Sequence, residues 1–168
     1  HIDKKFEGVI FRPATVCGYA PRLRLDLSVN ILTNHAIVNN KIIVFGGNQL
    51  RPNLHVMDYC DVVKLLITAP SNKINKEIFN VGYQNMSIKD IAKLVKKVIE
   101  KEFPDKKNIK IEKQESNDNR SYHINSDKIF NRLGFKAKRS IEDAIKSLAE
   151  SFKKGLINES FDNDIYYN

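Results

Sequence analysis

Arg51-Pro52-Asn53-Leu54-His55-Val56-Met57-Asp58 is the stretch around which the rest of the chain is organised. It follows Gly46-Gly47, which ends an apolar run, and it leads into a segment of helical pattern. We predict a very short strand over 54–56 and a helix capped by Asp58, because an aspartate can accept a hydrogen bond from the free N–H groups of a first turn. The cation Arg51 would then lie at a strand–helix junction, where an anionic ligand can be held.

The composition is typical of one soluble globular domain. The chain has 168 residues and is 42% hydrophobic and 29% charged, a mix that can build a core and a solvated surface. No apolar run approaches the roughly 20 residues of a membrane span. Cys17 and Cys60 are too few for a disulfide framework, and no spacing of His, Cys, Asp and Glu suggests a metal site. We therefore expect a cytoplasmic protein with no metal and no membrane contact.

The net charge of +8 fits three kinds of partner, namely nucleic acid, a membrane surface or an anionic small molecule. The lysines are spread over predicted helix faces with acidic residues among them, as at Lys93, Lys96 and Lys97. No basic block is interleaved with aromatic residues, which a nucleic-acid platform would need. We interpret most of the charge as solvated surface, and a basic nucleic-acid-binding domain stays as the weaker alternative.

Strands and helices alternate along the chain, which predicts an α/β fold. Strands are expected over 8–11, 41–45, 54–56, 78–81 and 109–111, the first of them buried and parallel. Helices are expected over 26–39, 58–69, 87–103, 126–133 and 140–154, with polar loops over 71–76 and 114–119. The helix after Asp58 is expected to bury Val62, Val63, Leu66 and Ile67, and Ser126 to cap the fourth helix.

Arginines follow several strand ends, where ligands bind in open α/β sheets. Arg22 and Arg24 follow the first strand, Arg51 follows the second, and Arg120 lies in the polar stretch after the last strand. The planar guanidinium group binds phosphate oxygens through two hydrogen bonds. Arginines that converge at one edge would suit a diphosphate, whereas a single one is more simply an exposed or locally paired loop cation.

Four segments resemble, in the same order, motifs of the NAD-dependent nucleotide-sugar epimerases and dehydratases, the extended short-chain dehydrogenases. They are Arg12-Pro13-Ala14-Thr15-Val16-Cys17-Gly18, the opening stretch 51–58, Phe79-Asn80-Val81-Gly82 with the capped helix start Ser87-Ile88-Lys89-Asp90, and Leu133-Gly134-Phe135 with Ser140-Ile141-Glu142-Asp143. The segment Pro21–Leu27 extends the first motif. Cys17 replaces the usual Tyr and is expected to be a small buried residue.

The resemblance implies roles in binding a nucleotide-diphospho-sugar. Arg51 would hold a phosphate or a ribose, and Arg120 would do the same from the opposite wall of the site. The base would pack along Val44, Phe45 and Gly46.

The resemblance also implies roles for the segment before the first helix. Thr15 lies where many relatives carry a ligand-binding Asn. Pro13 and Val16 would contact the nicotinamide end of NAD, the implied cofactor. The helix that covers the sugar diphosphate would begin at Arg24, Leu25 and Asp26.

Two parts of the family's machinery are absent from this sequence. It has no Gly-x-x-Gly-x-x-Gly fingerprint for NAD, and no tyrosine is followed four residues later by lysine. The family's catalytic Tyr-x-x-x-Lys takes the proton of a sugar hydroxyl while hydride leaves to NAD. Because both parts precede the first motif in the family, we interpret residues 1–168 as its C-terminal, substrate-binding portion, with no catalytic residue of its own.

The expected fold is therefore the C-terminal part of a Rossmann-type sheet with a small mixed α/β substrate-binding lobe. The parent protein would be an epimerase (isomerase) or a dehydratase (lyase), of the kind used in polysaccharide biosynthesis, and a homodimer. Its partners would be a nucleotide-diphospho-sugar and the N-terminal half of the same enzyme. The main alternative is a free-standing nucleotide-sugar-binding module without catalysis.

Overall fold

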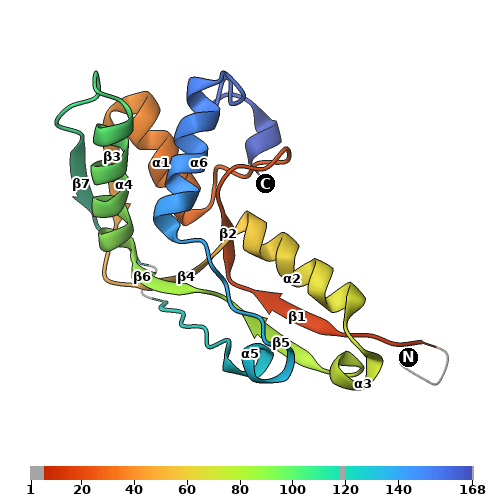
Figure 1. Cartoon of the computed structure of the whole chain (residues 1–168). Helices are drawn as coiled ribbons and strands as arrows, with labels where there is room; N and C mark the ends of the chain where they lie inside the picture. Colours follow the sequence, from red (N-terminus) through yellow and green to blue (C-terminus); the bar gives the residue numbers. More distant parts are fainter. Residues whose placement is uncertain (1–5, 118–119, 168) are drawn as a thin grey trace.

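The computed structural model describes residues 6–117 and 120–167, and it confirms the predicted α/β class (Figure 1). The strands are β1 (Ile10–Pro13), β2 (Thr15–Cys17), β3 (Lys41–Phe45), β4 (Leu50–His55), β5 (Ile78–Val81), β6 (Gln84–Ser87) and β7 (Lys110–Gln114). The helices are α1 (Ser28–Asn39), α2 (Val56–Thr68), α3 (Ser71–Ile74), α4 (Ile88–Glu102), α5 (Asp127–Leu133) and α6 (Ile141–Lys153), followed by the 3₁₀ turn η1 (Asp164–Tyr166).

The strands form three small sheets. β1 pairs with β5 and β3 pairs with β7, both parallel, whereas β4 lies between β2 (parallel) and β6 (antiparallel). The chain changes from the first sheet to the next at Ala14, whose N–H still donates to the carbonyl of Val81 at 2.7 Å. The β2–β4–β6 sheet therefore joins two lobes.

The helical lobe consists of α1, α4 and α6 packed on one another beside the β3–β7 pair, and the strand lobe consists of β1 and β5 with α2, α3 and α5 (Figure 1). Each lobe has its own apolar core. Fully buried side chains of the helical lobe include Val29, Ile42, Ile91 and Ile145. The strand lobe is centred on Phe79, which is 0% exposed.

The two longest predicted helices are confirmed. The apolar side chains at helical spacing in α4 are buried, and the Ser87 hydroxyl accepts from the Asp90 N–H at 3.2 Å, as a capping residue does. α6 opens with a complete capping box, in which Ser140 and Asp143 each accept from the other's backbone N–H. Periodicity and caps thus fixed these elements locally.

Several strand predictions were wrong in position or burial. β1 lies two residues later than predicted and is half exposed, with Ile10 at 53%. β4 runs over Leu50–His55, so Arg51 lies within a strand and not before one. β2 and β6 were not predicted.

The helix predictions also needed corrections. α2 begins at Val56, and its capping residue is His55, whose Nδ1 accepts from Met57 N–H at 3.1 Å, so Asp58 is not the cap. Ile67 is 78% exposed, although its position in α2 predicted burial. Residues 71–76 contain α3, and Ser126 makes no capping bond because its hydroxyl is bound to the backbone of Gly82.

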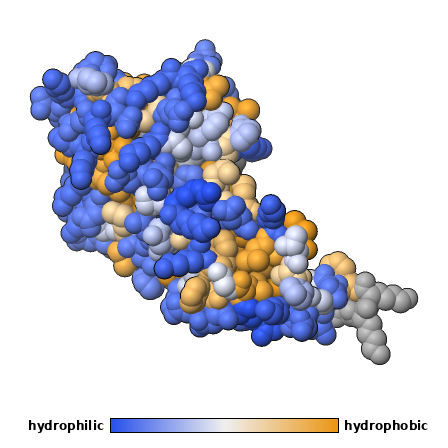
Figure 2. Space-filling view, viewed as in Figure 1, coloured by the Kyte–Doolittle hydropathy of each residue, from blue (hydrophilic) through white to orange (hydrophobic). Residues whose placement is uncertain are grey.

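An apolar face covers the outer side of α2 and continues to β1. Figure 2 shows apolar surface over this part of the strand lobe. Half-buried or exposed side chains of Tyr59, Cys60, Val63 and Ile67 contribute to it, and a hollow beside Val63 and Ile67 is also lined by Val9, Phe11 and Ile74. Within residues 6–117 and 120–167 no helix is long and apolar enough to cross a membrane.

Gly82, at the end of β5, leaves no room for a side chain. A Cβ atom there would overlap the Cγ2 methyl of Ile124 and lie 3.2 Å from the Cβ of Ala14. We expect Gly82→Ala to lower the free energy of unfolding by about 1–3 kcal/mol, the usual cost of overpacking, as measured by urea denaturation.

Ile124→Ala supplies the matched control, because it removes the methyl group that a new side chain at Gly82 would meet. In the Ile124→Ala background, Gly82→Ala should cost much less than it does alone. Equal costs in the two backgrounds would show that this contact does not explain the requirement for glycine.

Candidate functional site

Arg51 projects from β4 and is held by its own segment and by the polar stretch after β7. Its Nη1 donates to the carbonyl of Leu50 at 3.0 Å and to the carbonyl of Arg120 at 2.7 Å. Its guanidinium carbon lies 5.3 Å from the centre of the Tyr122 ring, within cation–π range. The guanidinium group is therefore oriented by contacts within the chain.

Asn53, two residues after Arg51, is a site-forming residue that the sequence reasoning missed. It is 1% exposed, its Nδ2 donates to the Arg51 carbonyl at 2.7 Å, and its Oδ1 lies 3.4 Å from the hydroxyl of Ser28 in α1. Its register partner in β2 is Thr15. Thr15, Arg51 and the start of α1 are thus brought together, and the alternation Arg51, Asn53, His55 along one strand was the available signal.

Arg24 lies in the segment between β2 and α1. Its Nε and Nη2 donate to the two carboxylate oxygens of Asp26 at 3.0 and 2.7 Å, and this hydrogen bonding raises the pKa of Arg24. Asp26 therefore pairs with Arg24 and does not begin the helix, which starts at Ser28. Arg24 also lines a hollow of about 120 Å³ together with Val16, Gly18, Arg22, Leu27, Asn30 and Val56.

The N-terminus of α1 opens beside this hollow. The capping position is occupied by Leu27, which makes no side-chain capping bond, and the first turn contains no acidic residue. The partial positive charge of a helix N-terminus favours an anion there. Arg24 and Arg22 lie in the same segment, where the Asp26 carboxylate offsets part of their positive charge near the start of α1.

Two of the predicted site residues are not brought to this surface. Leu25 is 0% exposed and packs in a third apolar cluster with Leu148, and Val44 is 3% exposed in the core of the helical lobe. Their assignment to the substrate stays a prediction, which this burial restricts to contact through the backbone. Phe45, by contrast, is 53% exposed, and Gly46 follows it with φ of 71° in the turn after β3.

Arg120 is next to Arg51 in the structure. The contact between them runs from the Arg51 guanidinium to the Arg120 backbone carbonyl. The neighbouring residues tie this stretch to β4, because Leu50 N–H donates to the Ser121 hydroxyl at 2.9 Å and Tyr122 N–H donates to the Leu50 carbonyl at 3.1 Å. Tyr122, two residues after Arg120, was not predicted as part of the site.

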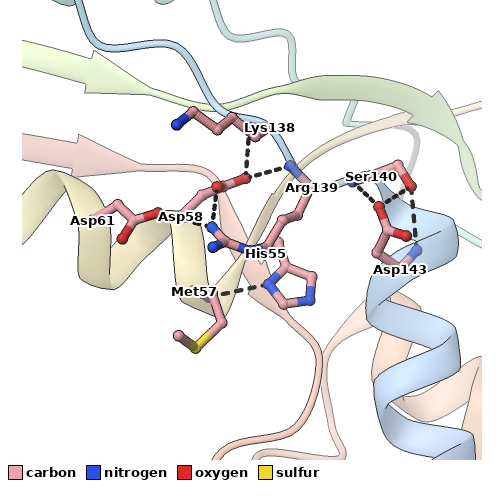
Figure 3. Close-up of polar contacts among 8 residues, drawn as sticks. All are labelled: His55, Met57, Asp58, Asp61, Lys138, Arg139, Ser140 and Asp143. Carbon is pink, nitrogen blue, oxygen red and sulfur yellow. Dashed lines mark hydrogen bonds and ion pairs between the residues drawn. The ribbon is translucent and has the colours of Figure 1, made fainter.

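Asp58 fastens the start of α2 to the segment that leads into α6 (Figure 3). Its carboxylate is 1% exposed and accepts from Lys138 N–H at 3.1 Å, from Arg139 N–H at 2.9 Å and from Arg139 Nη1 at 2.7 Å. Arg139 Nη1 also lies 2.8 Å from the exposed carboxylate of Asp61. Asp58 is therefore structural, but not as the predicted cap of its own helix, because its partners are distant in sequence.

His55 and Cys17 show no features of a catalytic pair. Burial lowers the pKa of His55, and its Nδ1 is already used to cap α2. Burial, with a smaller effect from the charge of Asp58, raises the pKa of Cys17 to about 12, so the thiol stays protonated at neutral pH. The prediction that Cys17 is a small buried residue is confirmed, at 1% exposure. The described residues contain no group of three or more His, Cys, Asp and Glu that could hold a metal ion.

The comparison with family models agrees with the motifs. Residues 2–82 match the NAD dependent epimerase/dehydratase family. The resemblance predicted from the sequence is thereby confirmed, since this range contains the Arg12–Gly18 motif, the 51–58 stretch and the Asn-Val-Gly end of β5.

Solved structures of epimerases and dehydratases have the same fold. A UDP-glucuronic acid 4-epimerase from Bacillus cereus, in complex with UDP-glucuronic acid and NAD, is 22% identical with a TM-score of 0.71 over 87% of this chain and 45% of its own. A dTDP-glucose 4,6-dehydratase from Bacillus anthracis, in complex with NAD, is 20% identical with a TM-score of 0.69 over 90% and 45%. Pal from Bacillus thuringiensis is 26% identical with a TM-score of 0.70 over 90% and 47%.

These proteins are about twice as long as the matched region. The chain spans 45–47% of the length of the three structures. Identities this low show a shared fold, which is Rossmann-like in this family, and NAD is the cofactor in the two complexes named above that contain it.

The contrast between Asp58 and Asp61 provides a stability test, because both carboxylates contact the same guanidinium group. Asp58→Ala should lower the free energy of unfolding by about 3 kcal/mol or more, since it leaves two backbone N–H groups and the guanidinium group without their acceptor. Asp61→Ala, at a side chain 49% exposed, should cost under about 1 kcal/mol. Urea denaturation of both variants checks this; similar losses would contradict the structural role given to Asp58.

Proposed function

We propose that this chain forms the nucleotide-diphospho-sugar-binding portion of an NAD-dependent epimerase or dehydratase. The observation that carries the proposal is that Asn53, which bonds to the Arg51 backbone carbonyl on β4, also lies 3.4 Å from the Ser28 hydroxyl at the start of α1, with Arg24 in the segment just before that helix. Guanidinium groups and helix N-termini both bind phosphate oxygens. A diphosphate bridging these groups would account for their arrangement.

The shape of the surface fits one wall of a site. The hollow beside Arg24 has a volume of about 120 Å³, below the roughly 300–1,000 Å³ of ordinary ligand pockets. The exposed ring of Phe45 and the turn at Gly46 would pack along the nucleotide base, and Arg120 would add charge from the stretch beside Arg51. We propose that the remaining wall comes from the rest of the parent protein.

The residues present fit only one end of NAD. Pro13 is exposed at the carboxyl end of β1, and Val16 is half-buried beside the hollow, so they offer apolar contact of the kind a nicotinamide ring accepts. NAD supplies hydride exchange with the sugar carbon when it is bound. This chain's own residues would orient the sugar nucleotide beside it, with Thr15 at the end of the site nearest β4.

An NAD-binding half would cover the apolar face of α2 and β1. β1 pairs only with β5 among the described residues, so its other edge can accept a further strand. Similar solved structures are about twice as long as this chain. We propose that the parent enzyme is a cytoplasmic homodimer, an isomerase or lyase acting in polysaccharide biosynthesis, and that the chain alone is inactive.

The test of the proposed function is ligand-induced thermal stabilisation of the chain by UDP, dTDP, GDP and CDP. A ligand that binds the folded state raises the melting temperature, and at a given concentration a tighter ligand raises it more. At least one nucleoside diphosphate should give such a shift, and Arg51→Ala should weaken its binding about tenfold or more, because a charge-assisted hydrogen bond is lost. No epimerase or dehydratase turnover is expected when NAD and UDP-glucose are added.

Arg132→Ala is the matched control, since Arg132 lies in α5 and pairs with Glu77 away from this surface. It should leave the stabilisation unchanged. A chain that none of the four diphosphates stabilises would contradict the proposal, and salt-sensitive binding to a random DNA duplex would then favour the nucleic-acid alternative. Sugar-nucleotide turnover by the chain alone would contradict its assignment as a binding portion.

A further inference from the structure

We infer that the C-terminal segment Ile157–Tyr167 positions Arg22 and Arg24 for the anionic ligand, a role that rests on the proposed function. The segment runs from the end of α6 back to the stretch Arg22–Leu25 (Figure 1). Its residues are remote from that stretch in sequence, and its contacts there are both apolar and hydrogen-bonded.

The Arg22-Leu23-Arg24-Leu25 stretch alternates charged and apolar residues. Leu23 is 3% exposed and Leu25 is 0% exposed, whereas Arg22 is exposed and Arg24 is half-buried beside the hollow. Burial therefore alternates from one residue to the next along this stretch. The buried contacts of the two leucines therefore hold this stretch in place. The same contacts set the direction of the two guanidinium groups.

The residues that pack around Leu23 and Leu25 come largely from the C-terminal segment. Leu23 and Leu25 form a separate apolar cluster with Ile157 of that segment and Leu148 of α6, against which Tyr166 and Tyr167 also pack. A backbone hydrogen bond from Leu25 N–H to the Tyr166 carbonyl, at 2.8 Å, fixes the residue directly after Arg24. The carbonyl of Arg24 itself accepts from the buried Asn30 side chain at 2.8 Å.

The C-terminal segment is in turn fixed to α1. The hydroxyl of Ser160 donates to the Asn34 side chain at 2.7 Å, and both residues are buried. The hydroxyl of Tyr167 donates to the Ser160 carbonyl at 2.7 Å and closes the turn of chain that contains η1. The segment thus connects the middle of α1 to the stretch before its N-terminus, where the proposed phosphate groups would bind.

The test measures UDP affinity by isothermal titration calorimetry for the chain and for a variant that ends at Asn163. This variant lacks the Tyr166 carbonyl and the Tyr167 ring, so the arginine stretch must be ordered when ligand binds. We expect the Kd for UDP to rise about fivefold, the order of effect for fixing one or two side chains on binding. An unchanged Kd would overturn the positioning role while leaving the proposed function intact.

A double-mutant cycle separates positioning from general loss of stability. If the segment acts through Arg22 and Arg24, the shortened chain in an Arg22→Ala/Arg24→Ala background should bind UDP as that double variant alone does. In an Arg51→Ala background the same shortening should still raise the Kd about fivefold. Equal effects in both backgrounds would overturn the inference.

A milder variant guards against failure of the shortened chain to fold. Tyr167→Phe removes only the hydroxyl that donates to the Ser160 carbonyl, and Tyr83→Phe, in the exposed turn between β5 and β6, is the matched control. Hydrogen exchange at the Leu25 amide should become faster in Tyr167→Phe but not in Tyr83→Phe. Unchanged exchange would overturn the anchoring, and failure of the unmodified chain to bind any of UDP, dTDP, GDP and CDP would overturn the proposed function together with this inference.

Discussion

The relative placement of the two lobes depends on the buried carboxylate of Asp58. A carboxylate at 1% exposure is costly unless its charge is matched, and here it accepts two backbone N–H groups and one guanidinium N–H. All three donors belong to Lys138 and Arg139, directly before α6 begins. This side chain therefore holds the segment before α6 against the start of α2, in addition to the β2–β4–β6 sheet that joins the two lobes (Figure 3).

α6, which follows the segment bound by Asp58, contacts the stretch that carries Arg24. Its Ser147 hydroxyl accepts from Tyr19 N–H at 3.1 Å, and its Leu148 packs against Leu25. The stretch that carries Arg24 is therefore held by a helix whose preceding segment is bound by Asp58. Arg51 and Asn53 belong to β4, the strand that ends where α2 begins, so both sides of the proposed site start from one junction.

The sequence predicted those elements whose signals lie within the element itself, namely an apolar period and a capping residue. α4 and α6 carry both an apolar period and a capping residue, and both were predicted within a residue or two. Asp58 was wrongly predicted to cap the helix. An aspartate near a helix start gives the same sequence pattern whether it accepts from N–H groups of its own first turn or from N–H groups far away in the sequence. Ile67 follows the period of α2 but is exposed, since a period shows which residues share a face and not what covers that face.

The site residues show a related limit. A family motif transfers positions along the chain, but the direction of each side chain depends on contacts that the motif does not contain. Leu25 and Val44 were assigned to the ligand by position, yet each lies on the inward side of an alternating stretch, next to an outward residue, Arg24 and Phe45 respectively. Asn53 and Tyr122 were missed because their roles arise only when β4 meets β2 and the polar stretch after β7.

The two arginines that we propose to bind phosphate, Arg24 and Arg51, are each held by several contacts within the chain, which would preorganise them for binding. Arginine side chains have many rotamers, and fixing them on binding reduces affinity. Here Asp26 holds Arg24 through two hydrogen bonds, and two carbonyls with the Tyr122 ring hold Arg51. The ordering is thus completed when the protein folds, before any ligand arrives. The same reasoning gives the buried contacts behind Leu23 and Leu25 a part in ligand affinity, although none of those groups faces the ligand surface.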